Sequence, residues 1–450
     1  MFSKILIANR GEIALRVIRA ARELGLKTVA VYSESDRNSL HTILADEKVC
    51  IGPAKASDSY LNIPNILGAA DITKSDAIHP GYGFLAENPR FAEICESSGI
   101  TFIGPQAAMI KLMGNKSLAR QEMKRARLFI LPGSEEVVES LPYAKKIAKK
   151  MGYPVILKAA AGGGGKGMRI VRTPGQLEEL FALTQNEAMA AFNNSSLYIE
   201  KYLASARHIE IQIIADTHGN VLALGERECS IQRKHQKVIE ETPSPFVDER
   251  LRKKIIKAAE EAARSIGYQS LGTFEFLVDE KKKFYFMEAN TRIQVEHPIT
   301  EMVYNVDLVK EQIRIAAGEK LSIPEGLEMR GHSLECRINA EDPVTYSPSP
   351  GTIDFLVLPG GQGIRVDSAA YQGWKIPSDY DSLIAKIAVL SPSRAEAIRK
   401  MQMALEMTTI VGIKSNLPLH LTILSDTDFI AGRYNTQFME RYQAKNNNQK

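Results

Sequence analysis

The stretch KAAAGGGGKGMRIV, from Lys158 to Val171, places four consecutive glycines between the apolar segments PVILKA and MRIV. Glycine loses more conformational freedom on folding than any other residue. A run of glycines is therefore costly unless the backbone needs positive φ angles or a close approach to another group. A negatively charged ligand would meet that requirement. The stretch predicts a glycine-rich hairpin that covers an anion, with an ordinary surface hairpin as the alternative.

Two common phosphate-binding fingerprints do not fit this stretch. A P-loop needs Lys and then Ser or Thr directly after its closing glycine, whereas Gly167 is followed by Met168. The G-x-G-x-x-G spacing is met by Gly162, Gly164 and Gly167, but a dinucleotide-binding turn must open a helix, and MRIV favours a strand. What remains is a flap of the kind that kinases fold over ATP phosphates.

Length and composition indicate an ordinary globular chain. Its 450 residues suffice for roughly two to four domains. The 57 basic and 53 acidic residues are too balanced for a protein whose main partner is nucleic acid or an anionic membrane. The cysteines are widely spaced and form no C-x-x-C pair, so no zinc site or disulfide framework is predicted. We expect a cytoplasmic protein without a leader peptide or a membrane span.

The apolar pattern predicts an α/β fold that begins with a Rossmann-like domain. Residues 4–32 favour strand, helix and strand, because Ala14, Val17, Ile18 and Ala21 follow helical spacing. Further strands are expected at 76–80 and 100–105, with a helix at 88–99 between them. This alternation is typical of a parallel sheet.

We predict three domains along the chain. They are an α/β domain at 1–112, a nucleotide-binding core at 113–330 and a C-terminal α+β domain at 331–446. A smaller, mobile lid that carries the glycine hairpin is expected at about 131–203.

The segment GTFEFLVDEKKKFYFMEANTRIQVEHP, residues 272–298, predicts a metal site on an antiparallel hairpin. If Asp279 pairs with Phe284, Glu275 lies opposite Glu288, and Asn290 points to the same side. Like charges that face each other across two strands are destabilising, so a cation is expected. Two carboxylates and an amide suit magnesium held together with phosphates. The alternative is a pair of solvent-exposed glutamates on an edge hairpin.

The letters RIQVEH continue this segment with alternating polar residues. As a strand they would put Arg292, Gln294 and Glu296 on one face. A guanidinium binds a small oxyanion with two hydrogen bonds, and a carboxylate can act as a general base. An internal salt bridge is the alternative.

Two further segments carry cations in strand-like surroundings. CSIQRKHQKVIEE, residues 229–241, would as one strand put Arg233, His235 and Lys237 on one face, which could bind phosphates or another anion. A solvated charged strand is the alternative. Arg337 in HSLECRINAED lies between apolar neighbours, where an unpaired charge is costly, and therefore needs a partner.

These motifs together resemble the biotin carboxylases, ATP-grasp enzymes that perform the first step of biotin-dependent carboxylases such as acetyl-CoA carboxylase. The matching segments run in order along nearly the whole chain: IANRGEIA, AIHPGYGFLAEN, GGGGKGMR, SIQRKHQKVIEE, NTRIQVEHPITEM, ECRINAEDP and PSPG. The resemblance implies a pre-ATP-grasp N-terminal domain, an ATP-grasp core with its lid and a C-terminal domain. Small departures are Ala289 in place of Met, and Tyr304 and Asn305 in place of Thr and Gly.

The resemblance also implies roles for individual residues. The implied nucleotide-binding residues are Lys116, Lys158, Gly164, Gly165, Glu200, Lys201, Tyr202, Leu203, His208, Gln232 and His235, together with Glu275 and Glu288. The implied ligands for two Mg²⁺ or Mn²⁺ ions are Glu275, Glu288 and Asn290. The implied bicarbonate-binding residues are Lys237, Arg292, Gln294 and Val295. Glu296 would remove the bicarbonate proton, and Arg337 would stabilise the enolate-like oxygen of the biotin ring.

The implied reaction couples ATP cleavage to formation of carboxyphosphate, which releases carbon dioxide for capture by biotin. Phosphoryl transfer needs positioning and charge neutralisation, and a closed lid protects the reactive intermediate from water. The implied partners are a biotin carboxyl carrier protein, carboxyltransferase subunits and a second copy of the chain. Alternatives are the biotin carboxylase subunit of a pyruvate or propionyl-CoA carboxylase, or another ATP-grasp ligase that activates bicarbonate.

Overall fold

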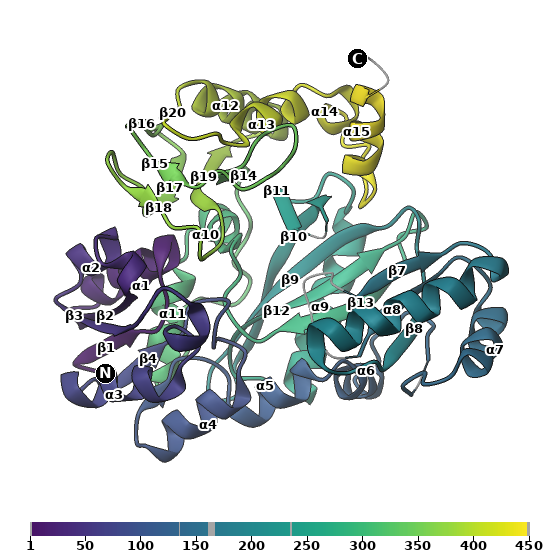
Figure 1. Ribbon diagram of the computed structural model, residues 1–450, viewed down its shortest axis with the longest axis horizontal. Helices are drawn as coiled ribbons and strands as arrows, with labels where there is room; N and C mark the ends of the chain where they lie inside the picture. The colour runs from purple at the N-terminus through teal and green to yellow at the C-terminus, as the bar shows by residue number, and fades with distance from the viewer. Residues whose placement is uncertain (1, 135, 161–166, 235, 448–450) are drawn as a thin grey trace.

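The computed structural model describes residues 2–134, 136–160, 167–234 and 236–447 (Figure 1). The N-terminal part is a parallel sheet in the order β3-β2-β1-β4-β5, which confirms the Rossmann-like start of an α/β fold. Its strands are β1 (Lys4–Ile7), β2 (Lys27–Ser33), β3 (Glu47–Gly52), β4 (Ala77–His79) and β5 (Thr101–Phe102). Its helices are α1 (Gly11–Glu23), α2 (Leu40–Leu44), α3 (Ile63–Thr73) and α4 (Pro89–Ser97). Helix α1 buries one apolar stripe against β1, as its spacing predicts.

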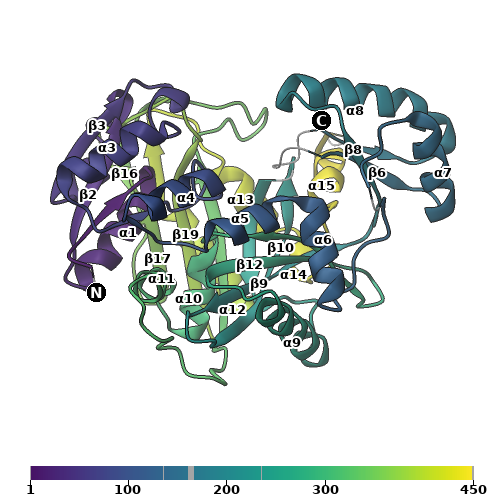
Figure 2. The same cartoon turned by 90° about the horizontal axis from the view of Figure 1, so that it is seen from below.

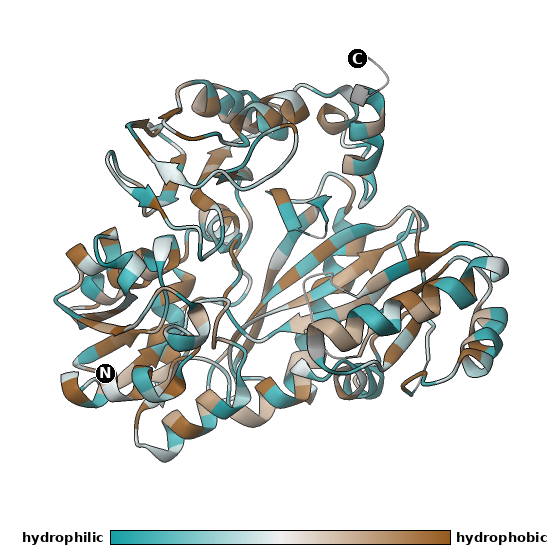
Figure 3. Cartoon of the chain, viewed as in Figure 1, coloured by the Kyte–Doolittle hydropathy of each residue, from teal (hydrophilic) through white to brown (hydrophobic). Residues whose placement is uncertain are grey.

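The centre of the molecule is an eight-stranded sheet in the order β13-β12-β9-β10-β11-β14-β19-β17, with antiparallel neighbours throughout. Its strands are β9 (Arg207–Ala215), β10 (Val221–Arg233), β11 (Gln236–Thr242), β12 (Ser270–Val278), β13 (Phe284–Asn290), β14 (His332–Asn339), β17 (Ile364–Ser368) and β19 (Leu383–Ser391). The nearby helices are α5 (Ala107–Gly114), α6 (Lys116–Arg125), α9 (Glu249–Ser265), α10 (His297–Tyr304) and α11 (Leu308–Ala316). Figure 3 shows hydrophilic and hydrophobic segments together along these strands.

The predicted lid forms a small α/β unit with its own core. The strands β6 (Val155–Ala159), β7 (Met168–Val171) and β8 (Leu197–Lys201) pair in the order β7-β6-β8 beside helices α7 (Leu141–Met151) and α8 (Leu177–Phe192). The antiparallel pairing of β6 with β7 confirms the two strands expected around the glycine run. Figure 2 shows α7 and α8 far from the N-terminal sheet.

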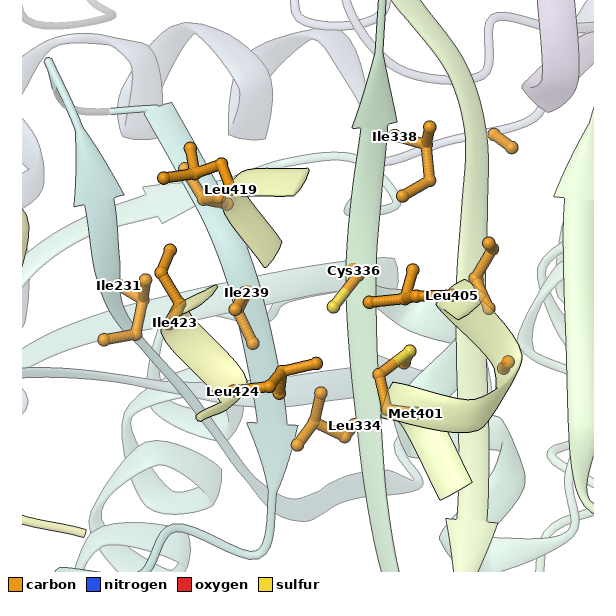
Figure 4. Packing of buried hydrophobic residues seen from close by; sticks show 14 of the residues in the cluster. Ile231, Ile239, Leu334, Cys336, Ile338, Met401, Leu405, Leu419, Ile423 and Leu424 are labelled. Atoms are coloured by element: carbon orange, nitrogen blue, oxygen red, sulfur yellow. The ribbon is translucent and has the colours of Figure 1, made fainter. Parts of the chain in front are cut away.

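The C-terminal part uses the far end of the same sheet. Figure 4 shows apolar side chains of β14, among them Leu334, Cys336 and Ile338, packed against residues of the C-terminal helices. Those helices are α12 (Arg394–Glu406), α13 (Leu417–Leu424), α14 (Thr427–Ile430) and α15 (Phe438–Asn447). The small pairs are β15 (Gly351–Thr352) with β18 (Lys375–Ile376), and β16 (Phe355–Val357) with β20 (Thr409–Val411). Because side chains alternate along a strand, Glu335 and Arg337 point to the opposite face of β14.

The register of the hairpin β12–β13 corrects one expectation. The assumed pairing of Asp279 with Phe284 is wrong, because Phe284 pairs with Val278. A β-bulge at Met287 then shifts the register by one residue. The two glutamates expected to face each other therefore do so.

The expected single strand around residues 229–241 is also wrong. Strand β10 ends at Arg233 and β11 begins at Gln236, with these two residues paired, so the chain reverses direction between them. Gln232 pairs with Lys237, so these two residues share one face, and Arg233 lies on the other face instead of beside Lys237 as expected. Likewise, residues 291–296 form turns before α10 and not the expected strand.

Among the described residues, no helix combines the length and the hydropathy that a transmembrane span requires.

Candidate functional site

Lys237 on β11 is the centre of a buried cluster of charges. Its Nζ lies 2.6 Å from Glu210, 3.0 Å from Glu275 and 2.6 Å from Glu296. Glu210 and Glu296 are 0 % exposed. Burial alone would lower the pKa of Lys237, but the three carboxylates outweigh burial and raise that pKa well above its usual range. The ammonium is therefore permanently charged and joins three strands and a turn.

Arg227 on β10 fixes the innermost carboxylate of this cluster. Its guanidinium forms an ion pair with Glu210 and hydrogen bonds to Gln212 Oε1 (2.8 Å), Thr300 Oγ1 (2.9 Å) and Thr273 Oγ1 (3.1 Å). It is fully buried. A buried charge with this many partners holds its surroundings rigid.

Arg337 on β14 has the partners that its sequence context demanded. Its Nε donates to Glu240 Oε1 at 2.6 Å, and its Nη2 donates to Glu296 Oε2 at 2.8 Å. Burial alone would raise the pKa of Glu296, but Lys237, Arg337 and Arg227 outweigh it and hold that pKa well below its usual range. Glu296 is therefore an ionised carboxylate, the state that a general base requires.

The hairpin β12–β13 brings the predicted metal ligands together. Glu275 lies directly opposite Glu288, and Asn290 Nδ2 donates to Glu275 Oε1 at 2.9 Å. Burial and the charge of Glu275 raise the pKa of Glu288. Two opposed carboxylates and an amide oxygen form a donor set that fits a hard divalent cation, which would relieve their repulsion.

Two other groups of side chains among the described residues have the geometry to hold a metal ion. His208, Glu210 and Glu275 have ligand atoms within 4.8 Å of one another, as do Glu210, Cys229 and Glu296. The ammonium of Lys237 contacts three of these carboxylates. It already supplies the positive charge that a metal ion would bring to either group.

Arg292 is held in place by groups from three segments. Its Nε donates to Glu87 Oε2 (2.9 Å), its Nη1 to Gln294 Oε1 (2.8 Å) and its Nη2 to Asn290 Oδ1 (3.0 Å). Gln294 in turn donates to Glu275 Oε1 at 3.0 Å. The turns at 291–296 thus bring this cation next to the predicted metal ligands, although they are not the strand that we expected.

The lid contributes charges on its side of the site. Lys158 on β6 and Arg120 on α6 both form ion pairs with Glu200 on β8. Burial and the charge of Lys158 lower the pKa of Lys116, while the charges of Glu288 and Glu200 raise it less. Two of the cations predicted to bind phosphates therefore lie near a predicted metal ligand.

His208 and Gln232 lie beside the predicted metal ligands. His208 Nε2 is 3.0 Å from Glu275 Oε2, and its Nδ1 is 2.8 Å from Gln232 Nε2. Val295 presents its backbone carbonyl to Lys386 Nζ at 2.9 Å. His208 and Gln232 therefore join the cluster around Glu275, whereas Val295 contacts Lys386.

The segment predicted to meet adenine covers the last two residues of the lid strand β8 and the two residues after it. Lys201 Nζ donates to the carbonyls of Gly152 (3.0 Å) and Tyr153 (3.2 Å), and the Tyr202 hydroxyl accepts from Gln437 Nε2 at 3.1 Å. Leu203 follows directly after them. Gly164, Gly165 and His235 lie outside the described residues.

Sequence reasoning missed several residues of the cluster. They are Glu87, Glu210, Arg227 and Glu240. One of them, Glu210, carries a signal that the sequence contains: a charged residue between two apolar neighbours, Ile209 and Ile211, the same signal that singled out Arg337. Glu87 offers no such signal, because it lies in a loop that only the fold brings to Arg292.

Models of known families match three consecutive parts of the chain. Residues 1–110 match the N-terminal domain of biotin carboxylase, and residues 335–441 match its C-terminal domain. Residues 115–324 match the ATP-binding domain of the carbamoyl-phosphate synthase L chain.

Known proteins match the chain from end to end. A biotin carboxylase of Haemophilus influenzae is 55% identical over 443 residues, 98% of this chain and 99% of that protein. A crystal structure of a biotin carboxylase complex with β,γ-ATP from Campylobacter jejuni gives a TM-score of 0.96 at 48% identity and covers 98% of this chain and 99% of that one. The biotin carboxylase domain dimer of the Hydrogenobacter thermophilus 2-oxoglutarate carboxylase, in complex with MgADP, ADP and bicarbonate, gives 0.95 at 49% identity and covers 98% of each chain.

Proposed function

The chain belongs to the biotin carboxylase family of ATP-dependent ligases, and on that premise we propose how its residues divide the work. The substrates are ATP, bicarbonate and biotin carried by a partner protein. The observation that carries the proposal is the buried carboxylate Glu296, held ionised between Lys237 and Arg337.

Glu296 is the general base for bicarbonate. The proposed bicarbonate-binding residues are Lys237, which contacts Glu296, Arg292 and Gln294, which are hydrogen-bonded to each other, and Val295. Once a proton leaves bicarbonate, these donors stabilise the second negative charge. Such preorganised charge is the main means by which enzymes favour phosphoryl transfer to a weak nucleophile.

The nucleotide binds between the lid and the central sheet. Lys116 and Lys158, with backbone N–H groups of the glycine run, hold the phosphates, and the segment 200–203 meets the adenine. His208, Gln232 and His235 complete this pocket. Glu275, Glu288 and Asn290 would hold magnesium or manganese, which when bound neutralises charge on the phosphates.

Arg337 serves the second half of the reaction. Its guanidinium stabilises negative oxygen character on the biotin ring while the ring nitrogen is carboxylated. In the structure that guanidinium contacts Glu296, and it turns towards biotin in the proposed second half-reaction.

We place this activity in acetyl-CoA carboxylase, as the step before malonyl-CoA formation in fatty acid synthesis, in the cytoplasm. The partners are a biotin carboxyl carrier protein, carboxyltransferase subunits and a second copy of the chain. The domain limits that we propose are 1–112, 113–330 and 331–446, with the lid at about 131–203. A biotin carboxylase subunit of another carboxylase is the second candidate, because a structural neighbour belongs to a 2-oxoglutarate carboxylase.

The test uses the purified full chain and two variants. We expect ADP release that requires bicarbonate and rises with free biotin. Arg337→Gln should lower the biotin-dependent rate by about 100-fold or more while bicarbonate-dependent ATP cleavage without biotin survives. The matched control is Arg433→Gln, because Arg433 is exposed and pairs only with Asp428 in the described structure. Equal loss of both activities in Arg337→Gln, or no response to biotin in the unaltered chain, would refute the proposal.

Reconstitution with a purified biotin carboxyl carrier protein and carboxyltransferase identifies the carboxylase to which this chain belongs. Turnover of acetyl-CoA with the acetyl-CoA carboxylase partners, and none with partners of pyruvate or 2-oxoglutarate carboxylase, is the expected result.

A further inference from the structure

A second pair of buried carboxylates lies behind Arg337, outside the groups already given a role. Glu240 on β11 is paired directly with Glu335 on β14, so their side chains lie on the same face of the sheet. Both residues are 0 % exposed. Directly opposed like charges destabilise a sheet, and burial makes the repulsion worse.

The hydrogen bonds of this pair are incomplete. Glu240 Oε1 accepts from Arg337, but Glu240 Oε2 has no partner within the described structure. Neither oxygen of Glu335 has a partner there either. Buried polar atoms are almost always satisfied, so three unsatisfied oxygens on two facing carboxyl groups indicate a proton that they share.

The nearby cations decide which of the two carries the charge. Arg337 contacts Glu240. Lys386, the other cation near Glu335, is already engaged by Glu12 at 3.1 Å and by the carbonyl of Val295 at 2.9 Å. The negative charge therefore belongs on Glu240 and the proton on Glu335.

The electrostatic surroundings agree with this assignment. Burial, the charge of Glu240 and the charge of Glu296 raise the pKa of Glu335 well above its usual range, against the opposing charges of Lys386 and Arg337. Burial and Glu296 raise the pKa of Glu240 to about 7, while Arg337 and Lys237 lower it. The groups that face the pair are Arg337 on β14, Lys386 on β19, Lys237 on β11, Cys229 on β10 and Glu296 before α10.

We infer that Glu240 and Glu335 hold one proton between them, and that the charged Glu240 is a positioning residue for Arg337. Glu240 keeps its contact with the guanidinium while that guanidinium leaves Glu296 and turns towards biotin. With Glu240 neutral, Arg337 would have Glu296 as its only contacting carboxylate within the described structure. The biotin site would then lack its cation. This inference rests on the proposed role of Arg337.

The proton itself is tested by infrared difference spectroscopy, which needs no activity. At pH 8 the spectrum of the unaltered chain minus that of Glu335→Gln should show the C=O stretch of a protonated carboxyl group, shifted in D₂O. The absence of such a band would overturn the shared proton, whatever the enzyme catalyses.

The positioning role is tested by kinetics on matched isosteric variants. Glu240→Gln should raise the KM for free biotin about tenfold or more and lower the biotin-dependent kcat. Its bicarbonate-dependent ATP cleavage without biotin should fall much less. Glu335→Gln mimics the protonated acid, so its values should stay within about threefold of the unaltered chain. Glu240→Asp, which keeps the charge, should recover part of the loss. Equal losses in Glu240→Gln and Glu335→Gln, or equal loss of both activities in Glu240→Gln, would overturn the role.

The pH profile separates positioning from a general loss of structure. The biotin-dependent kcat/KM of the unaltered chain should rise through an ionisation near pH 7, because Glu240 must be charged and its pKa is about 7. Glu335→Gln should keep that ionisation, and Glu240→Gln should lose it. An unchanged profile in Glu240→Gln would contradict the inference. Failure of the proposed function itself would show differently, as an absence of biotin-stimulated turnover in the unaltered chain.

Discussion

At the scale of single residues, Glu241 shows how a buried carboxylate stabilises the fold without touching the site. It accepts hydrogen bonds from His332 at 2.7 Å and from Arg394 at 2.7 and 3.0 Å. Burial alone would raise the pKa of Glu241, but His332 and Arg394 outweigh it and lower that pKa to about 2. The ionised form is thus strongly favoured in the folded state.

This shift predicts a dependence of stability on pH. Because the folded pKa is lowered, Glu241 contributes stability above its unfolded pKa of about 4.5, and that contribution disappears as the pH falls towards 2. Glu241→Gln should lower the free energy of unfolding by about 3 kcal/mol at pH 7. In urea titrations the difference from the unaltered chain should shrink below pH 4.5. Glu93→Gln, at an exposed position, is the control. A difference that stays constant down to pH 3 would contradict the assignment.

The sequence predicted site residues where the cooperating side chains lie in one continuous segment. Glu275, Glu288 and Asn290 were accessible because one hairpin carries all three and alternation fixes their face. Glu87 and Glu240 were not, because their partners Arg292 and Arg337 are distant in the sequence. Contacts of that kind depend on tertiary structure and leave no local pattern.

At the scale of elements, two expectations were wrong for the same reason: the sequence carries no local signal for the turn between β10 and β11 or for the bulge in β13. The hairpin between β10 and β11 lacks the Asn-Gly or Asp-Gly signal of a tight turn, and Lys234 adopts a φ of 48° there without being glycine. The bulge at Met287 has no signal either. Helix α1 was predictable because its apolar stripe repeats over several turns.

The departure at Tyr304 and Asn305 has a structural explanation. The Tyr304 hydroxyl accepts the backbone N–H of Gly225 at 2.7 Å, where β10 is irregular. Asn305 ends α10 in the left-handed conformation that Asn tolerates well. The pair therefore ties the end of a helix to the central sheet.

Strand β12 contains a glycine that the packing requires. A Cβ atom on Gly272 would lie 2.0 Å from the Tyr268 hydroxyl, which itself donates to the carbonyl of Leu271. Gly272→Ala should lower the free energy of unfolding by about 2 kcal/mol or more, because the buried ring has to move.

The matched control for this prediction is a glycine with open space around it. Gly68 in α3 has nothing within 4 Å of the added Cβ, so Gly68→Ala should raise stability by about 0.5–1 kcal/mol through helix propensity. Chemical denaturation of both variants measures the contrast. Equal effects of the two substitutions would count against the packing argument.

At the scale of the whole molecule, Tyr380 joins the C-terminal part to the N-terminal sheet. Its hydroxyl donates to Ser33 Oγ at 2.6 Å, its ring meets those of Tyr60 and Phe84 edge-on, and the Arg10 guanidinium lies 4.3 Å from its centre. The contact joins segments more than 300 residues apart.

Removing the Tyr380 ring should weaken the contact between the C-terminal part and the N-terminal sheet. Tyr380→Ala should speed hydrogen exchange in residues 371–382 and lower the unfolding free energy by about 2 kcal/mol, since a half-buried aromatic contributes less than a core one. Tyr143→Ala, at an exposed position in the lid, is the control and should leave exchange in that segment unchanged. Protection that persists in Tyr380→Ala would show that other contacts hold the segment.

The central sheet has a consequence for anyone who wishes to divide this chain. Strand β11 pairs with β10 on one side and with β14 on the other, so a single ladder of backbone bonds runs from the nucleotide-binding half into the C-terminal half. If the chain were divided before His332 and expressed as two fragments, each fragment would expose an unpaired strand edge that is prone to aggregation. Activity would return only when the two fragments associate and β11 pairs again with β14. This division point therefore suits a split reporter of protein association.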